Sequence, residues 1–209
     1  TSIATPHVDE LQGLPMVIFS STPRLTWALS VKRLIDLVGA TVCIAVTAPL
    51  MVFIAIAIKG TSPGPVLFKQ VRCTIRGRTF QMYKFRTMVR DAEHMQDELA
   101  PRNEVAGPVF KIRNDPRITA FGRFLRRHSL DELPQLFNVL AGQMSLVGPR
   151  PPLPSEVEQY KNWQRRRLSM RSGMTCLWQI SGRNEMGFEE WMKLDLEYID
   201  SWSLGLDIK

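Results

Sequence analysis

The sequence predicts an α+β fold that is mostly helical, with a small β-hairpin and one helix inserted in a membrane. Three observations support this prediction. An apolar run of 25 residues, Leu34–Ile58, carries a single charge, at Asp36. Two strand-like segments follow it, on either side of a short polar turn. The rest of the 209-residue chain shows helical periodicity broken by turn residues, and its length suffices for one or two domains.

The first 24 residues are predicted to be a linker from an upstream domain that this chain lacks. They are rich in turn residues, and only LPMVIFS, residues 14–20, is typical of a short strand. The chain begins without Met or a signal-peptide pattern and ends without a clear stop signal. We therefore expect a piece of a longer protein, truncated at its C-terminal end.

The apolar run Leu34–Ile58 is long enough to enter a bilayer, since a spanning helix needs about 20 apolar residues. A buried helix of a soluble protein is the alternative, although so long a run is rare there. Pro49 lies near the middle, where it removes a helix hydrogen bond and kinks or breaks the helix. Basic residues, which favour the cytoplasmic side, flank both ends of the run: Arg24, Lys32, Arg33, Lys59, Lys69, Arg72, Arg76 and Arg78. We expect a re-entrant helix broken at Pro49, with a plain spanning helix as the alternative.

Patterns after the apolar run predict one hairpin and several helices. The strand-like segments Pro65–Arg72 and Arg78–Met88 predict a β-hairpin that turns around Gly77. Helical patterns cover Asp91–Leu99, Arg117–Arg127, Leu133–Leu140 (which Gly142 ends), Gln159–Met170 and Glu189–Asp200. The basic, Trp-bearing segment Gln159–Met170 is either an amphipathic helix on anionic headgroups or a solvated helix.

Two adjacent carboxylates, Asp131 and Glu132, stand in a basic neighbourhood of the sequence that includes Arg126, Arg127 and Arg150. Ser129–Glu132 matches the S-x-x-E capping box, so helix capping is one interpretation. The other is a phosphate site, because arginines offer forked donors to phosphate oxygens and two carboxylates can hold Mg²⁺ beside phosphates. The two interpretations are compatible, since one carboxylate can cap while the other reacts.

Cations at two further motifs are candidate phosphate ligands. In GPRPPLP, residues 148–154, the prolines fix the backbone, so Arg150 is presented by a rigid loop. In KFRT, residues 84–87, a strand ends with Lys84 and Arg86. An ordinary surface turn and a solvated strand end are the alternatives. Together with Arg126, these three cations form the predicted phosphate-binding set.

The net charge of +7 predicts an anionic partner, such as nucleic acid, anionic lipid or a nucleotide-like substrate. The basic residues are spread along the chain without a nucleic-acid-binding motif, so we expect no nucleic-acid partner. The cysteines Cys43, Cys73 and Cys176 lack metal-ligand spacing and are expected to be reduced thiols.

Four stretches together resemble the bacterial sugar transferase family, the monotopic phosphoglycosyl transferases. They are SPGPVLFKQVR (62–72), FQMYKFRTM (80–88), NDPRITAFGRFLRRHSLDELPQLFNVLAGQMSLVGPRPPLP (114–154) and TCLWQISGRNE (175–185). The similarity covers residues 32–209 and is specific only in combination. Residues 9–24 are similar to the linker of larger members, which carry an upstream domain and extra membrane helices.

The resemblance implies an enzyme that moves a sugar-1-phosphate from a UDP-sugar to polyprenyl (undecaprenyl) phosphate and releases UMP. Asp131 would be the nucleophile of a covalent phosphosugar intermediate, and Glu132, beside Asp131, the main side-chain ligand of Mg²⁺. The family's helix break falls on Pro49, its PRP motif on Pro149–Pro151 and its KFR motif on Lys84–Arg86. The reaction would be the first membrane step of exopolysaccharide or O-antigen assembly.

The resemblance also implies an organisation of the chain. We expect a linker at 1–24, an interface and re-entrant membrane helix at 25–59, and a cytosolic catalytic domain at 60–209. The enzyme would lie on the cytoplasmic face of the bacterial inner membrane. Glucose or galactose is the expected sugar, and the larger members favour a homodimer unless the absent regions hold it together.

The expected chemistry is consistent with the charges of the reactants. A lipid phosphate is already ionised at pH 7, so it needs no general base. A carboxylate with an ordinary pKa is ionised as well and can attack phosphorus directly. Mg²⁺ and the arginines would offset the negative charge that two anions bring together.

Three turns depart from the family's usual pattern. Thr74 stands where a Gly is frequent, Gly142-Gln143 where Gly-Asp is frequent, and Ser172-Gly173 where Pro-Gly is frequent. These departures concern loop geometry rather than the two carboxylates.

Three other classes of protein are alternatives to the transferase: a membrane-anchored scaffold that needs no carboxylate pair, a nucleic-acid-binding protein, and a phosphatase that releases free sugar phosphate.

Overall fold

The computed structural model describes residues 6–11, 14–19, 26–99, 101, 103, 112, 114–176 and 187–208. The helices are α1 (Thr26–Thr61), α2 (Gln96–Leu99), α3 (Ala120–Arg127), α4 (Gln135–Leu140), α5 (Pro154–Glu158), α7 (Phe188–Asp200) and α8 (Leu204–Ile208). Short 3₁₀ helices are η1 (Ile75–Gly77), η3 (Leu130–Glu132) and η4 (Gln164–Ser169). The strands are β1 (Pro6–Leu11), β2 (Leu14–Phe19), β3 (Leu67–Cys73), β4 (Thr79–Phe85), β5 (Ser145–Val147) and β6 (Gly173–Thr175). This mixture confirms the α+β class, and β2 coincides with the strand expected near residues 14–20.

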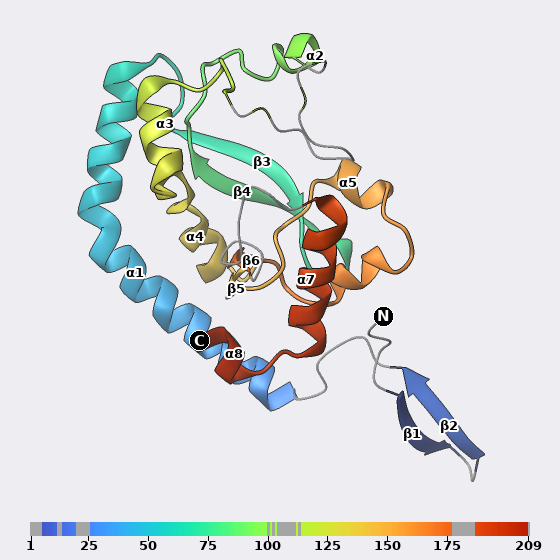
Figure 1. Ribbon diagram of the computed structural model, residues 1–209. Coiled ribbons are helices and arrows are strands. Elements are labelled where there is room, and N and C mark those ends of the chain that lie inside the picture. Colours follow the sequence, from blue (N-terminus) through green and yellow to red (C-terminus); the bar gives the residue numbers. More distant parts are fainter. Residues whose placement is uncertain are drawn as a thin grey trace.

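Helix α1 is continuous through Pro49, so the expected break is a bend within one helix (Figure 1). Its apolar part makes it the one helix in the described part of the chain that is long and apolar enough to cross a membrane. Pro49 lies on the exposed side. Its ring crowds the carbonyl of Ala45 and lengthens that side, so the helix bends toward the opposite side, which contacts the protein body.

One face of α1 packs on the body and the other is exposed and apolar. Buried residues on the packed face are Ala28, Lys32, Asp36, Ala40, Ile54 and Ile58. Gly39 lies so close to the body that a Cβ there would come 2.7 Å from Leu146 Cδ1. Large exposed apolar side chains line the other face: Trp27, Val31, Leu34, Ile35, Val38, Val42, Val46, Leu50, Val52, Phe53 and Ile56. They recur every three or four residues, so they form one stripe along the helix.

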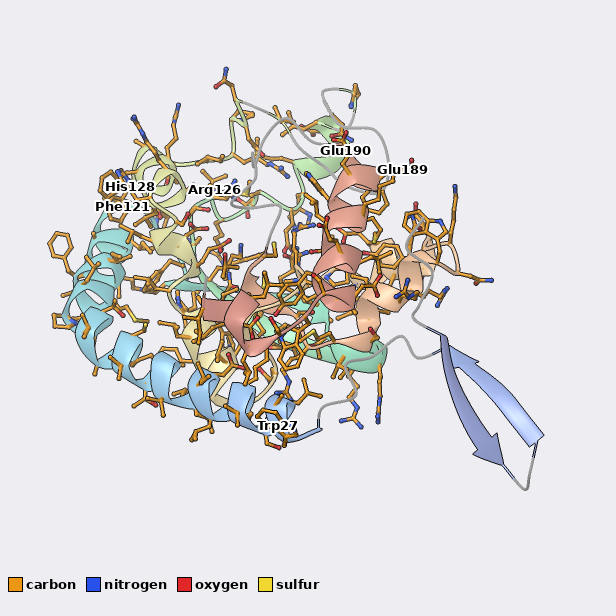
Figure 2. The ribbon with its side chains drawn as sticks, turned by 60° about the horizontal axis from the view of Figure 1, so that its bottom comes forward. Trp27, Phe121, Arg126, His128, Glu189 and Glu190 are labelled. Atoms are coloured by element: carbon orange, nitrogen blue, oxygen red, sulfur yellow. The ribbon has the colours of Figure 1, made fainter. Side chains whose placement is uncertain are left out.

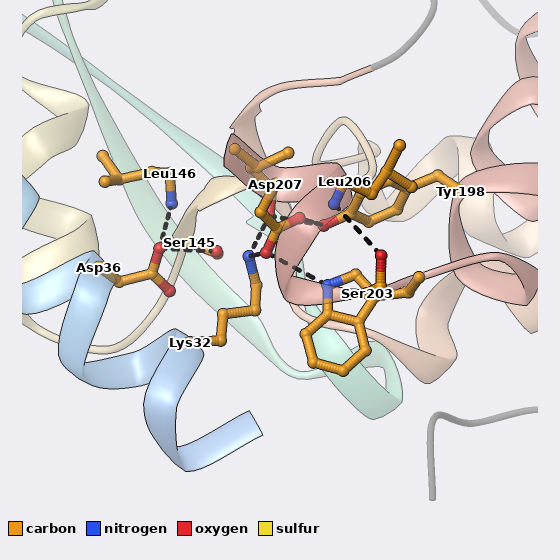
Figure 3. Close-up of polar contacts among 10 residues, drawn as sticks. Lys32, Asp36, Ser145, Leu146, Tyr198, Ser203, Leu206 and Asp207 are labelled. Atoms are coloured by element: carbon orange, nitrogen blue, oxygen red, sulfur yellow. Dashed lines mark hydrogen bonds and ion pairs between the residues drawn. The ribbon is translucent and has the colours of Figure 1, made fainter. Parts of the chain in front are cut away.

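Polar side chains attach the first half of α1 to the body. Asp36, the single charge in the apolar run, accepts hydrogen bonds from Ser145 Oγ (3.0 Å) and Leu146 N (2.9 Å). Lys32 pairs with Asp207 of α8 at 2.5 Å (Figure 3). Arg33 donates to the carbonyls of Val139 and Leu140, which end α4. These residues therefore bind the body rather than merely flanking a membrane segment.

Apolar side chains attach the second half of α1 to the same body. Ile54 and Ile58 pack with Phe85 of β4 and Leu125 of α3 in one cluster. Lys59 donates to the carbonyl of Gly64 in the following loop. Both ends of α1 consequently contact one globular unit, and Figure 1 shows the helix curving around that unit.

The β3–β4 hairpin forms as predicted and turns through η1. Arg76 and Gly77 have positive φ values of 58° and 72°, as a tight connection of antiparallel strands requires. Strand register pairs Arg72 with Phe80 and Phe68 with Lys84. Since directly paired residues share a face, these four side chains project from one side of the hairpin.

The turn from α3 to α4 differs from the expected capping box. Ser129 adopts the left-handed conformation (φ 55°), and its side chain makes no capping hydrogen bond to the described residues. Thr119 instead caps α3 by accepting from Gly122 N. The interpretation of Ser129–Glu132 as a capping box is therefore wrong, because Asp131 and Glu132 lie in the separate 3₁₀ turn η3.

The segment predicted as a basic amphipathic helix, Gln159–Met170, contains only η4 and packs against α7. Arg167 is buried and pairs with the buried Asp195 at 2.5 Å, and Arg166 pairs with Asp200. Two arginines expected on a solvent or membrane surface thus neutralise α7 within the protein. This pairing favours internal packing over contact with lipid headgroups.

Two of the three departures from the family pattern touch each other. Thr74 Oγ1 accepts a hydrogen bond from Ser172 N at 3.3 Å, and Ser172 Oγ donates to the carbonyl of Cys73 at 3.2 Å. A Gly at 74 would lack the acceptor, and a Pro at 172 would lack the donor. The third departure, Gln143, accepts from Asn138 Nδ2 at 2.6 Å.

Candidate functional site

A cavity opens between the hairpin, η3 and the loop after β5. The described residues that line it are Arg72, Met82, Lys84, Glu132, Gln135, Arg150, Pro151, Gly173, Met174 and Cys176. The hairpin contributes Arg72, Met82 and Lys84 from one face. Lys84 Nζ contacts Glu132 Oε1 at 2.7 Å. The structure thus joins two predicted site residues that stand 48 positions apart in the chain.

Asp131 is buried beside this pair, with 7% of its surface exposed. Burial raises the pKa of its carboxyl, and the neighbouring Glu132 raises it further, while Lys84 and Arg126 act in the opposite direction. The expectation of an ordinary pKa is therefore wrong. A desolvated carboxylate held near cations is nevertheless suited to attack an electrophilic phosphorus once ionised.

The loop that carries Arg150 is held as rigidly as its prolines predict. Pro149 is fully buried, and its carbonyl accepts from Gly173 N at 2.9 Å. The carbonyl of Pro152 accepts from Cys73 N at 2.8 Å. Glu156, 1% exposed, lies 3.8 Å from Arg150 and also accepts from Leu153 N at the start of α5. Arg150 is thereby fixed at the cavity wall.

Arg72 lines the cavity, although the sequence analysis predicts it only as a basic residue that flanks the apolar run. Its Nη1 donates to the carbonyl of Pro151, and its Nε and Nη2 donate to Gln70 Oε1. Burial and the nearby Arg150 lower its pKa to about 10, and Glu156 partly opposes them. Two arginines side by side signal a site for an anion. The strand period could have found Arg72, because it shares a face with Lys84.

The remaining predicted phosphate ligands are placed differently. Arg126 interacts electrostatically with Asp131, and its Nε donates to Thr87 Oγ1 at 2.9 Å. Figure 2 shows it on α3, apart from Phe121 of the same helix and from His128, which follows the helix. Arg86 donates to the carbonyls of Ser62 and Pro63 and is not among the described residues that line the cavity. These contacts favour a structural role for Arg86, which closes the loop after α1.

The cations that line the cavity are spread along one face of the hairpin. Lys84 pairs with Phe68 and Arg72 pairs with Phe80 in the hairpin register, so the two cations are four rungs apart. At about 3.3 Å per residue, this spacing corresponds to roughly 13 Å. The Lys84 end holds the carboxylate pair, and the Arg72 end holds the arginine pair.

A divalent metal has a limited set of protein ligands here. Among the described residues, no group of three or more His, Cys, Asp or Glu side chains gathers in a metal-binding arrangement. Mg²⁺ usually takes one or two carboxylates and completes its shell with water and substrate phosphates. Glu132, which lines the cavity, and its neighbour Asp131 fit that pattern.

Comparisons with known proteins agree on one family. A family model described as bacterial sugar transferase matches residues 27–209. The galactosyl transferase CpsE of Streptococcus agalactiae is 42% identical over 209 residues, 100% of this chain and 46% of that protein. An undecaprenyl-phosphate galactose phosphotransferase of Salmonella typhimurium is 41% identical over 181 residues, 85% of this chain and 38% of that protein.

A third relative is named for a different sugar. The UDP-glucose:undecaprenyl-phosphate glucose-1-phosphate transferase of Escherichia coli is 38% identical over 216 residues, 100% of this chain and 44% of that protein. The chain therefore spans less than half the length of each of these three relatives. The motif TCLWQISGRNE lies mostly outside the described residues, since the structure describes only 175 and 176 of it.

Proposed function

Because this chain belongs to the bacterial sugar transferase family, we propose that it transfers a sugar-1-phosphate from a UDP-sugar to undecaprenyl phosphate and releases UMP. The observation that carries the proposal is the buried Asp131 beside the Lys84–Glu132 pair, in a cavity that two arginines also line. Glucose or galactose is the sugar, as in the names of the relatives. The product would begin the assembly of an extracellular polysaccharide.

The transfer proceeds in two displacements at phosphorus. A carboxylate oxygen of Asp131 attacks the sugar-bearing phosphorus, an aspartyl–phosphorus bond forms, and the bond to the bridging oxygen breaks as UMP leaves with the electron pair. An oxygen of undecaprenyl phosphate then attacks the same phosphorus, and the Asp131 carboxylate leaves. Neither step needs a proton, because nucleophiles and leaving groups are anions. The bond between the sugar and its phosphate oxygen stays intact.

Cations make the approach of two anions feasible. Lys84 and Arg126 act at the Asp131 end, where the attacked phosphorus lies. Arg72 and Arg150 act at the other end, where the departing UMP gains charge. Glu132, with Asp131, would hold Mg²⁺, which when bound supplies further charge neutralisation to the diphosphate.

The exposed stripe of α1 supports an enzyme seated on one side of a membrane. At about 1.5 Å per residue the 36-residue helix is about 54 Å long, and large exposed apolar side chains run along one face of it, as is typical of a membrane or protein contact. Both ends of α1 contact the same polar body, so a crossing would drag charged groups such as Lys32 into lipid. We infer that α1 enters and returns on the cytoplasmic face of the inner membrane, bent at Pro49. Figure 2 places the acidic Glu189 and Glu190 of α7 well away from Trp27 of α1.

Intact mass of the detergent-solubilised protein tests the reaction directly. The protein is incubated with Mg²⁺ and either UDP-glucose or UDP-galactose, without lipid, beside the Asp131→Asn variant. A hexose-phosphate mass gain with equimolar UMP, absent in the variant, is the expected result. UMP release that needs undecaprenyl phosphate and leaves no adduct would overturn the covalent mechanism. Free sugar phosphate without lipid product would identify a hydrolase instead.

A further inference from the structure

Gln135, the first residue of α4, is a buried amide directed into the cavity. Only 2% of its surface is exposed, yet it lines the cavity together with Lys84 and Glu132. Its side chain forms no hydrogen bond within the part of the chain that the structure describes. Its carboxamide therefore keeps hydrogen-bonding groups available at the cavity surface.

The same helix shows what a structural amide looks like. Asn138, one turn further along α4, is fully buried and forms three hydrogen bonds. It accepts from Tyr83 N at 3.0 Å, and it donates to the carbonyl of Gln81 at 2.7 Å and to Gln143 Oε1 at 2.6 Å. The helix therefore satisfies one buried amide completely within the protein and leaves the amide that lines the cavity available to a ligand.

The chemistry of the cavity indicates which part of a ligand it awaits. Lys84, Arg72 and Arg150 provide positive charge, which suits phosphate oxygens. A neutral carboxamide offers a donating NH₂ group and an accepting oxygen, which suits a hydroxyl group, itself a donor and an acceptor. On the proposed donor, hydroxyl groups occur on the transferred sugar and on the ribose.

Position along the cavity separates these two sources. Gln135 follows Glu132 by three residues and Asp131 by four, so it stands about one helical turn from the attacked phosphorus. The nucleoside must extend away from that phosphorus, toward the Arg72 end roughly 13 Å from Lys84. We propose that the Gln135 carboxamide binds a hydroxyl of the sugar being transferred. This inference rests on the proposed function and adds to it a contact that selects the sugar.

Binding measurements can test the contact without turnover. Gln135→Met keeps the length and volume of the side chain but removes its hydrogen bonds, and Asp131→Asn is used as the background so that the donor stays intact. Calorimetric titration then compares the UDP-hexose with UMP. We expect Gln135→Met to weaken UDP-hexose binding about tenfold, the effect of one lost hydrogen bond, and to leave UMP binding unchanged.

Deoxy donors identify the hydroxyl. One UDP-deoxyhexose should bind about tenfold more weakly than the parent when Gln135 is present, and equally well when Met replaces it. Gln81→Met, an exposed site on β4, is the matched control and should change neither affinity. Thermal unfolding of each variant confirms that it is folded.

Three outcomes would overturn the contact. Equal loss of UMP and UDP-hexose binding would assign Gln135 to the nucleoside or phosphates. Unchanged binding of both would make it a structural residue, and a lowered melting temperature of Gln135→Met with unchanged affinities would say the same. Because these are affinities, they remain informative if the wild-type protein forms no adduct, which would contradict the proposed function alone.

Discussion

At the scale of single residues, opposing electrostatic effects act on the pKa of the Asp131 carboxyl. Burial and Glu132 raise its pKa, and Lys84 and Arg126 limit the rise. A group whose pKa is higher in the folded state binds its proton more tightly there than in the unfolded chain. Its ionised form therefore costs stability as the pH rises through that pKa. The ionised Asp131 that the proposed reaction needs thus lowers the free energy of unfolding.

Replacing Asp131 by Asn separates these two effects. We expect Asp131→Asn to abolish adduct formation and to melt at an equal or higher temperature than wild type at pH 7, because the costly charge is gone. Differential scanning fluorimetry in detergent measures the melting temperature. A large fall would show that the ionised carboxylate stabilises the protein.

The pH dependence of adduct formation follows from the same shift. The rate should fall toward acid as Asp131 becomes protonated, with a midpoint above the ordinary aspartate value of about 3.9. Single-turnover UMP release in buffers of constant ionic strength measures it. An acid limb at or below the ordinary value would contradict the direction of the shift.

Lys84 and Arg86 differ in role although they stand two residues apart. Lys84→Gln should lower the rate of adduct formation about 100-fold and change stability by less than about 1 kcal/mol, because the side chains of its pair with Glu132 are 26% and 28% exposed. Arg86→Gln should cost about 2 kcal/mol of stability, because it frees Ser62 and Pro63 carbonyls from a charged donor. Urea unfolding and UMP release on both variants decide the assignment, and the reverse pattern would restore Arg86 to phosphate binding.

At the scale of elements, α1 is a helix with one face packed on the protein body, here called the protein face, and one exposed apolar face. The bend at Pro49 keeps the protein face in contact with the body at both ends. A straight helix would lose contact at one end, because the body is convex against it (Figure 1). The proline thus acts on the docking of α1 as well as on its shape.

Labelling of introduced, exposed cysteines tests the course of α1, since the native Cys73 and Cys176 are buried. In a Cys43→Ser background, Ser30→Cys and Gly60→Cys place thiols near its two ends. Both should react with a membrane-impermeant maleimide in inverted vesicles and stay unreactive in intact spheroplasts, as expected for a helix that enters and returns on the cytoplasmic side. Reaction of either cysteine from the outside would mean that the helix spans the membrane.

For the molecule as a whole, the contact of α8 with α1 joins the last described helix to the first helix of the chain's described part. Asp207 accepts from Lys32, from Tyr198 OH at 2.6 Å and from Trp202 Nε1 at 3.2 Å (Figure 3). Burial, together with the hydrogen bond to Asp207, raises the pKa of Tyr198. These four side chains hold α7 and α8 against the start of α1.

Breaking the contact between Lys32 and Asp207 should lower the free energy of unfolding more than removing an exposed charge does. Lys32→Met leaves Asp207 buried without its cation and should cost about 3 kcal/mol, since both side chains are less than one tenth exposed. Lys59→Met, an exposed lysine at the other end of α1, is the control and should cost well under 1 kcal/mol. Equal melting temperatures for the two variants would contradict a stabilising role for the pair.

Periodic and compositional signals could predict the elements but not their polar partners. The hairpin, α3, α4 and α7 fall where the sequence patterns place them, because each pattern is local. The roles of Asp36 and Arg33 could not be read from the chain, because Leu146, Val139 and Leu140 stand more than 100 residues away. The capping box failed at Ser129 because a local motif cannot reveal a left-handed residue.

Site residues that occur together in short charged motifs could be predicted from the sequence. Site residues that stand alone in the sequence could not. Asp131, Glu132 and Arg150 occur in short, charged motifs, and the structure places Glu132 and Arg150 at the cavity and Asp131 beside it. In the sequence, Arg72 is one of several cations that flank the apolar run, and Gln135 is an uncharged residue that no motif singles out. Both become informative only when the hairpin and α4 are packed together.

The contact between Thr74 and Ser172 has a consequence for exchanging segments between relatives. Thr74 lies in the hairpin turn and Ser172 in the strand-leading loop 98 residues later, yet each supplies what the other needs. A chimera with a hairpin that has Gly at 74 would leave the Ser172 N–H without its acceptor. A chimera with Pro at 172 would leave the Thr74 hydroxyl without its donor. Successful grafts should therefore carry both segments from one parent, which gives a rule for choosing crossover points when transferases of this family are recombined.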